Sequence, residues 1–364
     1  MNRRGLLTLA ITAGSLLVLG LVVVLWPVRG MYWQTAGRPG EDIRVVIPQG
    51  ASTDTIGRLL AQQGVIGSTT FFRLYLALSG RGRSLQAGDY LFSSGLTIPQ
   101  VVSELSAGDG AYNTVIVTIP EGFTVRQIAQ LLAKDKVCSE QAFMHEATHG
   151  MFSQYPFWKF IATHNKYIRD RLEGYLFPNT YYFLRNESPV AVIDKILSET
   201  SSVLTPVMRT IKKEHLTLPE VMTVASMIEK EAKLASDRPL IASVIYNRLH
   251  LHPPMKLQID STTDYALGGI TVLTDADLQS MNPYNTYTHA GLPPGPIANP
   301  GWASIEAAIH PAHTDYYYYV AKGNGSGGSY FAVTYAQQLA NIARRESNLA
   351  KRASVAHSPT ASLH

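Results

Sequence analysis

The same order of strand and helix patterns occurs twice in this chain, and this repetition limits its fold more than any other feature. The β-branched stretch 43–50 (IRVVIPQG) ends in a turn and precedes helical patterns from 52–63 onwards, before the strand-like segment 87–92. The stretch 114–122 (TVIVTIPEG) repeats this beginning, and 173–183 (EGYLFPNTYYF) repeats its end. We therefore predict two diverged β-α-α-β units, the second interrupted by a longer insertion.

The chain after this repeat has a different pattern. Residues 200–348 are rich in helix patterns, and 314–333 (TDYYYYVAKGNGSGGSYFAV) predict two strands joined by a Gly/Ser turn. The last stretch, 351–364, is rich in Ser, Ala and His without periodicity, which predicts disorder. Helices and strands together predict an α+β fold.

An uncharged apolar run covers residues 6–26 (LLTLAITAGSLLVLGLVVVLW). As a helix it would span about 31 Å, which matches the hydrocarbon thickness of a bilayer. The run is longer than the apolar region of a cleaved signal peptide. Arg3 and Arg4 favour a cytoplasmic N-terminus. We therefore predict a single-pass helix in the cytoplasmic (inner) membrane, with the following residues in the periplasm or extracytoplasmic space.

These patterns define the predicted domain boundaries. The folded part contains two regions, one for each β-α-α-β unit. The boundaries are 1–5 for the cytoplasmic N-terminus, 6–27 for the transmembrane helix, 41–110 for the first β-α-α-β module, 111–348 for the second domain (114–199 for the second unit and 200–348 for the helical and hairpin region) and 351–364 for the tail.

Composition excludes several classes of function. The 31 basic and 27 acidic side chains give a net charge of +4, too small to indicate a nucleic-acid partner. The one cysteine, Cys138, excludes an internal disulfide framework and a cysteine-based zinc cage. His310 and His313 are three residues apart, but Pro311 disfavours a helix there and no acidic helix motif accompanies them. We predict no metal site.

Two glutamates interrupt the apolar run 225–232 (ASMIEKEA). The helix that contains them is predicted to start at Thr217, because Thr217 and Glu220 have the spacing of a capping box. At about 100° per residue, side chains two positions apart diverge by roughly 200°. Glu229 and Glu231 therefore cannot share one pocket, which excludes a glycosidase built from these two carboxylates alone.

The periodicity leaves open which glutamate faces a cleft. Glu231 lies beside Met227 and Val224, and an apolar setting raises the pKa of a carboxyl, as a general acid requires. The alternative places both glutamates on a solvated flank, where one of them pairs with Arg238 or Arg248.

Several spaced motifs resemble one known family. Taken in order, they closely resemble the endolytic murein transglycosylases, also called YceG-like proteins. The motifs are ASMIEKEA (225–232), VIYNRL (244–249), LQIDSTTDYALG (257–268), YNTYTHAGLPPGPIANPG (284–301) and AAIHPAHTDYYYYV (307–320), with EGYLFPNTYYF (173–183) upstream, where Asn179 replaces the usual aspartate. The resemblance extends over roughly residues 40–348. The first β-α-α-β module also resembles a LysM-type glycan-binding module.

The resemblance implies a membrane-anchored lytic transglycosylase that cuts peptidoglycan strands internally, between N-acetylmuramic acid and N-acetylglucosamine. The family's catalytic glutamate corresponds to Glu231, which would protonate the glycosidic oxygen and then accept a proton from the muramic C6 hydroxyl. The product is a 1,6-anhydro end, and no cofactor is implied. The implied partners are nascent glycan strands and the peptidoglycan synthases that make them.

Other residues are candidates for supporting the reaction or binding the substrate. They are Glu229 as an orienting partner, Asn247 and Arg248 near a helix end, Gln258 and Asp260 on one face of an extended segment, and Tyr284, Asn285 and Tyr287 at the start of a Gly/Pro-rich loop. Each also has an ordinary structural interpretation, in a cap, a turn or the core. Two other functions stay open: a non-catalytic peptidoglycan-binding scaffold, and a muramidase-type hydrolase in which Asp260 activates water.

Overall fold

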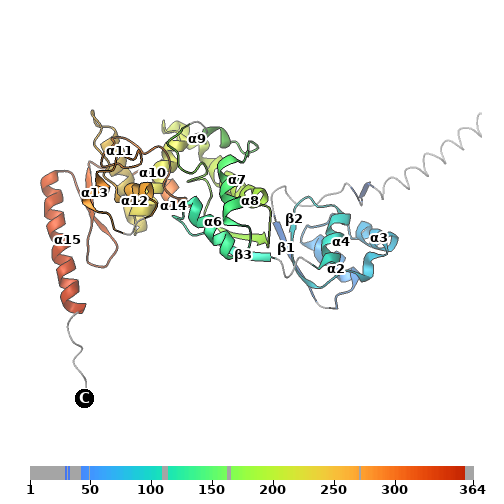
Figure 1. The fold of residues 1–364 in the computed structure, drawn as a ribbon. Coiled ribbons are helices and arrows are strands. Elements are labelled where there is room, and N and C mark those ends of the chain that lie inside the picture. The colour runs from blue at the N-terminus through green and yellow to red at the C-terminus, as the bar shows by residue number, and fades with distance from the viewer. Residues whose placement is uncertain are drawn as a thin grey trace, which may run out of the picture. The chain divides into compact units, whose positions relative to one another are not determined.

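The computed structural model describes residues 29–30, 32, 42–48, 50–108, 114–161, 165–269 and 272–356 (Figure 1). These residues form a mixed α+β structure. They divide into two compact units: one contains the described residues up to Ile116 together with Tyr182–Arg185, and the other contains Val117–Tyr181 and the described residues from Asn186 onwards. Each unit is described by itself.

The first unit has the predicted β-α-α-β order, followed by one further helix. Its elements are β1 (Asp42–Ile47), α2 (Thr53–Gln62), α3 (Thr69–Ser79), η1 (Arg81–Arg83), β2 (Gly88–Ser93) and α4 (Ile98–Ala107). β1 and β2 pair antiparallel, with Asp42 opposite Ser93. Side chains of both strands and all three α-helices, among them Val45, Leu60, Phe72 and Val101, form its buried core.

The predicted fold class requires one correction. It included a transmembrane helix over residues 6–27, but no helix within the described residues is long and apolar enough to cross a membrane. The longest of them, α15 (Tyr335–Ala356), carries five charged side chains between Arg344 and Arg352. Residues 6–27 themselves lie outside the described part of the chain.

The second β-α-α-β pattern is also present. Its elements are β3 (Thr114–Thr118), α6 (Val125–Lys134), α7 (Glu140–His149), η2 (Trp158–Phe160), β4 (Thr180–Leu184) and α8 (Pro189–Leu204), and β3 pairs with β4. The segment between α7 and β4 is the predicted insertion. Thr124 starts α6 with a capping box, in which its side chain accepts from the N–H of Gln127.

The remainder of the second unit is helical apart from one hairpin. Its elements are η3 (Thr205–Val207), α9 (Met208–Lys213), α10 (Leu218–Glu231), η4 (Ala235–Asp237), α11 (Arg238–Leu249), α12 (Asp260–Leu267), α13 (Asp275–Leu278), α14 (Trp302–Ile309), β5 (Tyr318–Ala321), β6 (Ser329–Ala332) and α15. The hairpin β5–β6 was predicted and packs on α15 (Figure 1). α15 continues to Ala356, because the helix-favouring Lys, Arg and Ala side chains extend it into the predicted tail. Residues 357–364 lie outside the described residues.

Helix α10 is the centre of this unit. Its N-terminus has the predicted capping box, with the N–H of Thr217 donating to Glu220 Oε2 at 2.8 Å. Its middle, from Val221 to Ile228, is buried and packs against α11, α12 and α14. Ser226 in this buried stretch accepts a hydrogen bond from the backbone of the Pro-rich loop. α10 ends at Glu231, so that this side chain lies at the end of a rigid helix.

A buried carboxyl connects several segments of the same unit. Glu173 is 2% exposed and accepts hydrogen bonds from the N–H of Val125 and Nδ2 of Asn299 through Oε1, and from the hydroxyl of Tyr265 through Oε2. Burial, with a contribution from the negative charge of Asp170, raises the pKa of Glu173 to about 8. All its oxygens are used for contacts that hold the fold together.

Candidate active site

The Glu231 carboxyl accepts hydrogen bonds from two hydroxyl groups. Ser261 Oγ, in the first turn of α12, donates to Oε1 at 2.9 Å. The hydroxyl of Tyr319, on β5, donates to Oε2 at 3.2 Å. The side chain is half-buried. Three elements from distant parts of the chain therefore meet at this carboxyl.

The surroundings of Glu231 favour its protonated form. Burial is the main cause that raises the pKa of this carboxyl, and the negative charge of Asp260 adds to it. The hydrogen bonds from Ser261 and Tyr319 act in the opposite direction. Burial and the charge of Glu231 also hold the pKa of Tyr319 well above its usual range, so that this hydroxyl stays a hydrogen-bond donor. The arrangement can hold a proton and can also stabilise the carboxylate left after its transfer.

Asp260 and Tyr287 form a second polar pair near Glu231. The Tyr287 hydroxyl donates to Asp260 Oδ1, and burial and this carboxylate raise the pKa of Tyr287. Asp260 is the first residue of α12, and Gln258 has a φ of 50°, so this segment is not extended, as a shared face for the two side chains would require. Both side chains are exposed, and alternation along a strand does not place them on one face.

Arg248 fixes the segments that carry Ser261 and Tyr319, the two donors to Glu231. Its guanidinium is 7% exposed and donates to the carbonyls of Tyr317 at 2.6 Å and Leu257 at 2.6 Å. It also lies over the ring of Tyr318, 5.4 Å from the centroid. The Tyr317 carbonyl directly precedes β5, and Leu257 precedes α12. Arg248 therefore positions both the Tyr319 and the Ser261 segments.

Asn247 has a similar effect from the same helix. Its Nδ2 donates to the carbonyls of Thr314 at 2.7 Å and Tyr316 at 3.0 Å. These contacts join α11 to the approach to β5. Asn247 makes no hydrogen bond to Glu231 in the described structure, so it acts on the position of the hairpin.

Glu229 points to a different helix. Its Oε2 accepts from the N–H of Gly301 at 3.1 Å and from Ser304 Oγ at 2.8 Å, and Arg238 Nη2 lies 4.0 Å from Oε1. Gly301 and Ser304 belong to the N-terminus of α14, where a negative charge is favourable, whereas Arg238 begins α11. The predicted divergence of the two glutamates is thus observed, and no hydrogen bond joins Glu229 to Glu231 among the described residues.

The three candidates at the start of the Gly/Pro-rich loop have different positions. Tyr284 is 3% exposed and packs on Tyr265, with ring centroids 5.0 Å apart. Asn285 is fully buried and bonds to Thr263 and to the backbone carbonyls of Leu278, at the end of α13, and Ser280. Only Tyr287 of the three reaches the polar groups near Glu231, through Asp260.

Comparison with known proteins gives this geometry a context. The model of the YceG-like family matches residues 45–344. The chain belongs to the YceG-like family. It is 36% identical over 290 residues to a Bacillus subtilis (strain 168) protein named endolytic murein transglycosylase, covering 78% of this chain and 79% of that protein. A protein of the same name from Streptococcus pneumoniae serotype 2 is 33% identical over 301 residues, covering 77% of this chain and 54% of that protein.

A solved member of the family has a similar fold. The crystal structure of a yceG-like protein from Listeria monocytogenes matches with a TM-score of 0.58 and 34% sequence identity. The match covers 82% of this chain and 99% of the Listeria chain. Both the sequence and the fold therefore support the assignment to the YceG-like family.

Sequence reasoning missed two residues of the site in this YceG-like chain, Ser261 and Tyr319. Both lie inside motifs that carried the resemblance, at 257–268 and 307–320. Ser261 follows the candidate Asp260 directly, and Tyr319 is one of four consecutive tyrosines. A signal for Tyr319 exists in the strand period, because Tyr317 and Tyr319 lie on one face of a strand while Tyr318 lies on the other.

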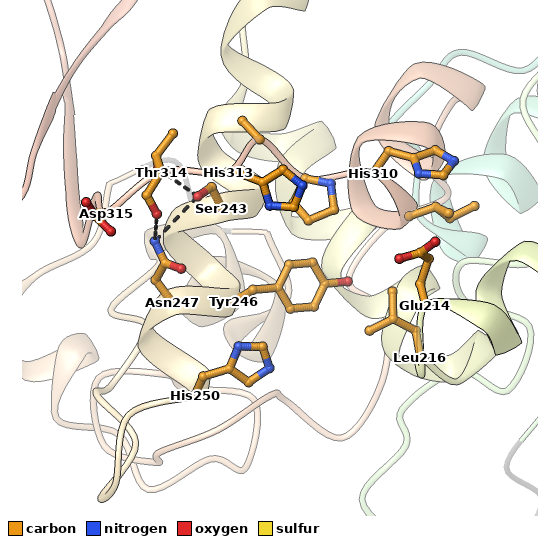
Figure 2. Close-up of a pocket in the computed structure, with 13 residues that line it drawn as sticks. Glu214, Leu216, Ser243, Tyr246, Asn247, His250, His310, His313, Thr314 and Asp315 are labelled. Carbon is orange, nitrogen blue, oxygen red and sulfur yellow. Dashed lines mark hydrogen bonds between the residues drawn. The ribbon is translucent and has the colours of Figure 1, made fainter.

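One cavity of the described structure lies away from Glu231 in the same unit. It has a volume of about 570 Å³ and is lined by one face of α11, the segment after α14 and residues near the end of α9. Figure 2 shows the ring of Tyr246 between His310 and Glu214 on one side and Asp315 on the other. None of its lining residues bonds to Glu231, and the described residues contain no group of three or more His, Cys, Asp or Glu that could hold a metal ion.

Proposed function

We propose that this chain is a murein transglycosylase that cuts glycan strands within their length, with Glu231 as the acid and base. The observation that carries the proposal is the Glu231 carboxyl, half-buried, with a raised pKa and two hydroxyl donors. Relatives named endolytic murein transglycosylase, at 36% and 33% identity, support the reaction class. The resemblance of the sequence motifs also selects Glu231 of the two glutamates.

The reaction would use this one carboxyl twice. Protonated Glu231 gives its proton to the glycosidic oxygen between N-acetylmuramic acid and N-acetylglucosamine, and the C1–O bond breaks through an oxocarbenium-like state. The carboxylate then accepts the proton of the muramic C6 hydroxyl, whose oxygen forms a bond to C1. The product is a 1,6-anhydro end, and no water is consumed. Ser261 and Tyr319 stabilise the carboxylate between the two proton transfers.

The main competing proposal is a hydrolase in which Asp260 is the second carboxylate. A muramidase-type hydrolase needs a second carboxylate to activate water or to stabilise the cation. Asp260 is near enough to raise the pKa of Glu231, but one of its oxygens accepts from Tyr287. A hydrolase would release reducing ends, whereas the proposed transglycosylase releases anhydro ends. A non-catalytic scaffold would release neither.

The test is digestion of purified peptidoglycan with mass spectrometry of the fragments. We expect anhydro-muramic ends from the unmodified protein and none from Glu231→Gln. Glu229→Gln is the matched control, because it makes the same chemical change two residues earlier, against α14. Reducing ends would instead assign a hydrolase, and binding of glycan without cleavage would favour the scaffold.

We also propose that the strands cut are newly made ones, that the enzyme acts beside peptidoglycan synthases, and that the first unit is a LysM-like glycan-binding module. The support is the family resemblance of the motifs and the β-α-α-β order of the first unit. In a reaction where a synthase polymerises lipid-linked precursor, adding the protein should shorten the strands. Strands of unchanged length, with activity only on mature wall, would contradict this proposal.

A further inference from the structure

A separate cavity of about 230 Å³ opens beside Ser261, the residue that donates to Glu231. Its other walls come from the first turns of α6, the segment around Arg169 and Asp170, Lys230 of α10 and the remainder of α12. Ser261 therefore belongs both to this cavity and to the surroundings of Glu231. The cavity therefore adjoins the surroundings of Glu231.

Three cationic side chains line this cavity, which we call the basic pocket: Arg126, Arg169 and Lys230. Arg169 is held in place, because its Nη1 donates to the carbonyl of Tyr265 at 2.7 Å and its guanidinium lies 5.5 Å from the centre of that ring. Arg126 and Lys230 are exposed, and within the described residues neither makes a hydrogen bond or an ion pair. The pocket therefore presents two cations with free donors next to a fixed one.

The acidic side chains of the pocket do not balance this charge. They are Asp170 and Asp264. Asp170 is 9% exposed, and burial raises the pKa of its carboxyl, although Arg169 and Arg126 oppose this effect. Three cations thus face at most two anions, and the side chains of Gln127 and Gln130 add only neutral amides. The excess charge favours an anionic group over a neutral sugar ring.

The charge of murein strands is located in their peptide stems. The two amino sugars are neutral within a strand, since the lactyl carboxyl of muramic acid is used in the amide bond to the stem. Free carboxylates occur further along the stem. If the muramic ring lies at Glu231, its stem begins beside the cavity that Ser261 lines and can place a carboxylate among the three cations.

We propose that the basic pocket is a subsite for a carboxylate of the peptide stem on the muramic acid at which the strand is cut. The proposal rests on the proposed function. It makes the enzyme selective for strands that carry stems with free carboxylates. Arg126 and Lys230 would bind the carboxylate, and Arg169 would shape the wall beside it.

Cleavage of two substrates tests the selectivity. They are strands with native stems and strands whose stem carboxylates have been converted to amides. The unmodified protein should cut native strands with a kcat/KM about tenfold above that for amidated strands, and Arg126→Gln/Lys230→Gln should remove most of this ratio through KM. Lys212→Gln/Lys213→Gln is the matched control, because it removes the same charge from the exposed face of α9.

Binding gives a second readout that does not depend on cleavage. Calorimetry with muramyl dipeptide and its amidated form should show tighter binding of the free carboxylate, again by about tenfold, and loss of this preference in Arg126→Gln/Lys230→Gln but not in the control. If the preference in binding is present while no strand is cut, the subsite stands and the proposed function falls. Equal binding of both forms, or an unchanged ratio in the pocket variant, would overturn the subsite.

Discussion

The two glutamates at the end of α10 differ in what surrounds them more than in their own chemistry. Glu229 accepts from a backbone N–H and a serine at the N-terminus of α14, with Arg238 near it. Glu231 accepts from the hydroxyls of Ser261 on α12 and Tyr319 on β5, and burial raises its pKa. Glu229 accepts hydrogen bonds at the start of a neighbouring helix, while burial raises the pKa of Glu231. Position on the helix therefore gives the two glutamates different surroundings, which is the basis for proposing Glu231 as the acid.

Glu173 is a third glutamate with a raised pKa, but its surroundings differ from those of Glu231. Its pKa is also raised, to about 8, but it is 2% exposed and both its oxygens accept from groups of the protein. A raised pKa by itself does not identify a reacting group. Glu231 differs because it is half-buried and adjoins the basic pocket through Ser261.

The largest expected difference is between the two glutamine variants. Glu231→Gln should lower kcat by about 10³-fold, because general acid–base catalysis contributes about 10²–10⁴-fold. Glu229→Gln should leave kcat within about threefold and lower the free energy of unfolding by about 1 kcal/mol, because it weakens the cap of α14. Release of soluble fragments and thermal unfolding measure the two effects. Equal losses of kcat, with both variants folded, would remove the distinction between the glutamates.

The arginines near the glutamates give the next largest contrast. Arg248→Lys should lower kcat by about 30-fold, because an ammonium cannot donate to the Tyr317 and Leu257 carbonyls together and the donors of Glu231 then shift. Arg238→Lys, near Glu229, should change kcat less than about threefold. The pH profile of kcat/KM separates a role of Arg248 in positioning the donors of Glu231 from a simple loss of stability. Only the Arg248 variant should shift the part of the profile that is set by the pKa of Glu231. A profile unchanged in both variants would reject the positioning role.

Ser261 and Ser304 each donate to one of the two glutamates, and smaller effects are expected from their replacement. The hydrogen bond from Ser261 lowers the pKa of Glu231 by stabilising its charged form, so Ser261→Ala should raise that pKa further. The alkaline limb of the pH profile should then move to higher pH, with kcat reduced about tenfold. Ser304→Ala, which removes a donor to Glu229, should leave the limb in place and cost about 1 kcal/mol of stability. Movement of the limb to lower pH in Ser261→Ala would contradict this account.

Glu173 should affect stability and its dependence on pH. Its folded-state pKa of about 8 lies above its ordinary value of 4.5, so the folded protein binds the proton more tightly than the unfolded chain. The stabilisation that this carboxyl contributes is therefore present in full below pH 4.5 and is lost as the pH rises towards 8. The loss between pH 6 and pH 8 is at most about 2.7 kcal/mol. Denaturant unfolding across this range measures the slope. Glu173→Gln should flatten it, and an unchanged slope in the variant would assign it to other groups.

Local patterns predicted much of the fold. The capping box at Thr217, the hairpin at 314–333 and both β-α-α-β orders follow from spacing and propensity within short windows. The divergence of Glu229 and Glu231 also followed from helix geometry alone. Each of these features depends on residues close together in the sequence.

The site was less accessible to such reasoning, because its contacts are long-range. Gln258 adopts a left-handed φ of 50°, which no local pattern indicated, and Asp260 starts a helix. Tyr284 and Asn285 are polar enough to suggest a binding loop, but they are buried in its support. The choice of Ser261 and Tyr319 as donors depends on packing between α10, α12 and the hairpin, which the sequence alone does not specify.

The separation of Glu231 from its donors has a consequence for how the molecule matures. Ser261 lies 30 residues after Glu231 in the chain and Tyr319 lies 88 residues after it. During synthesis the acid is made first, and its hydroxyl partners leave the ribosome only later. A nascent or truncated chain that stops before β5 carries the glutamate without the groups that hold it. Under the proposed mechanism, the carboxyl acquires both hydroxyl partners only when the last hairpin docks.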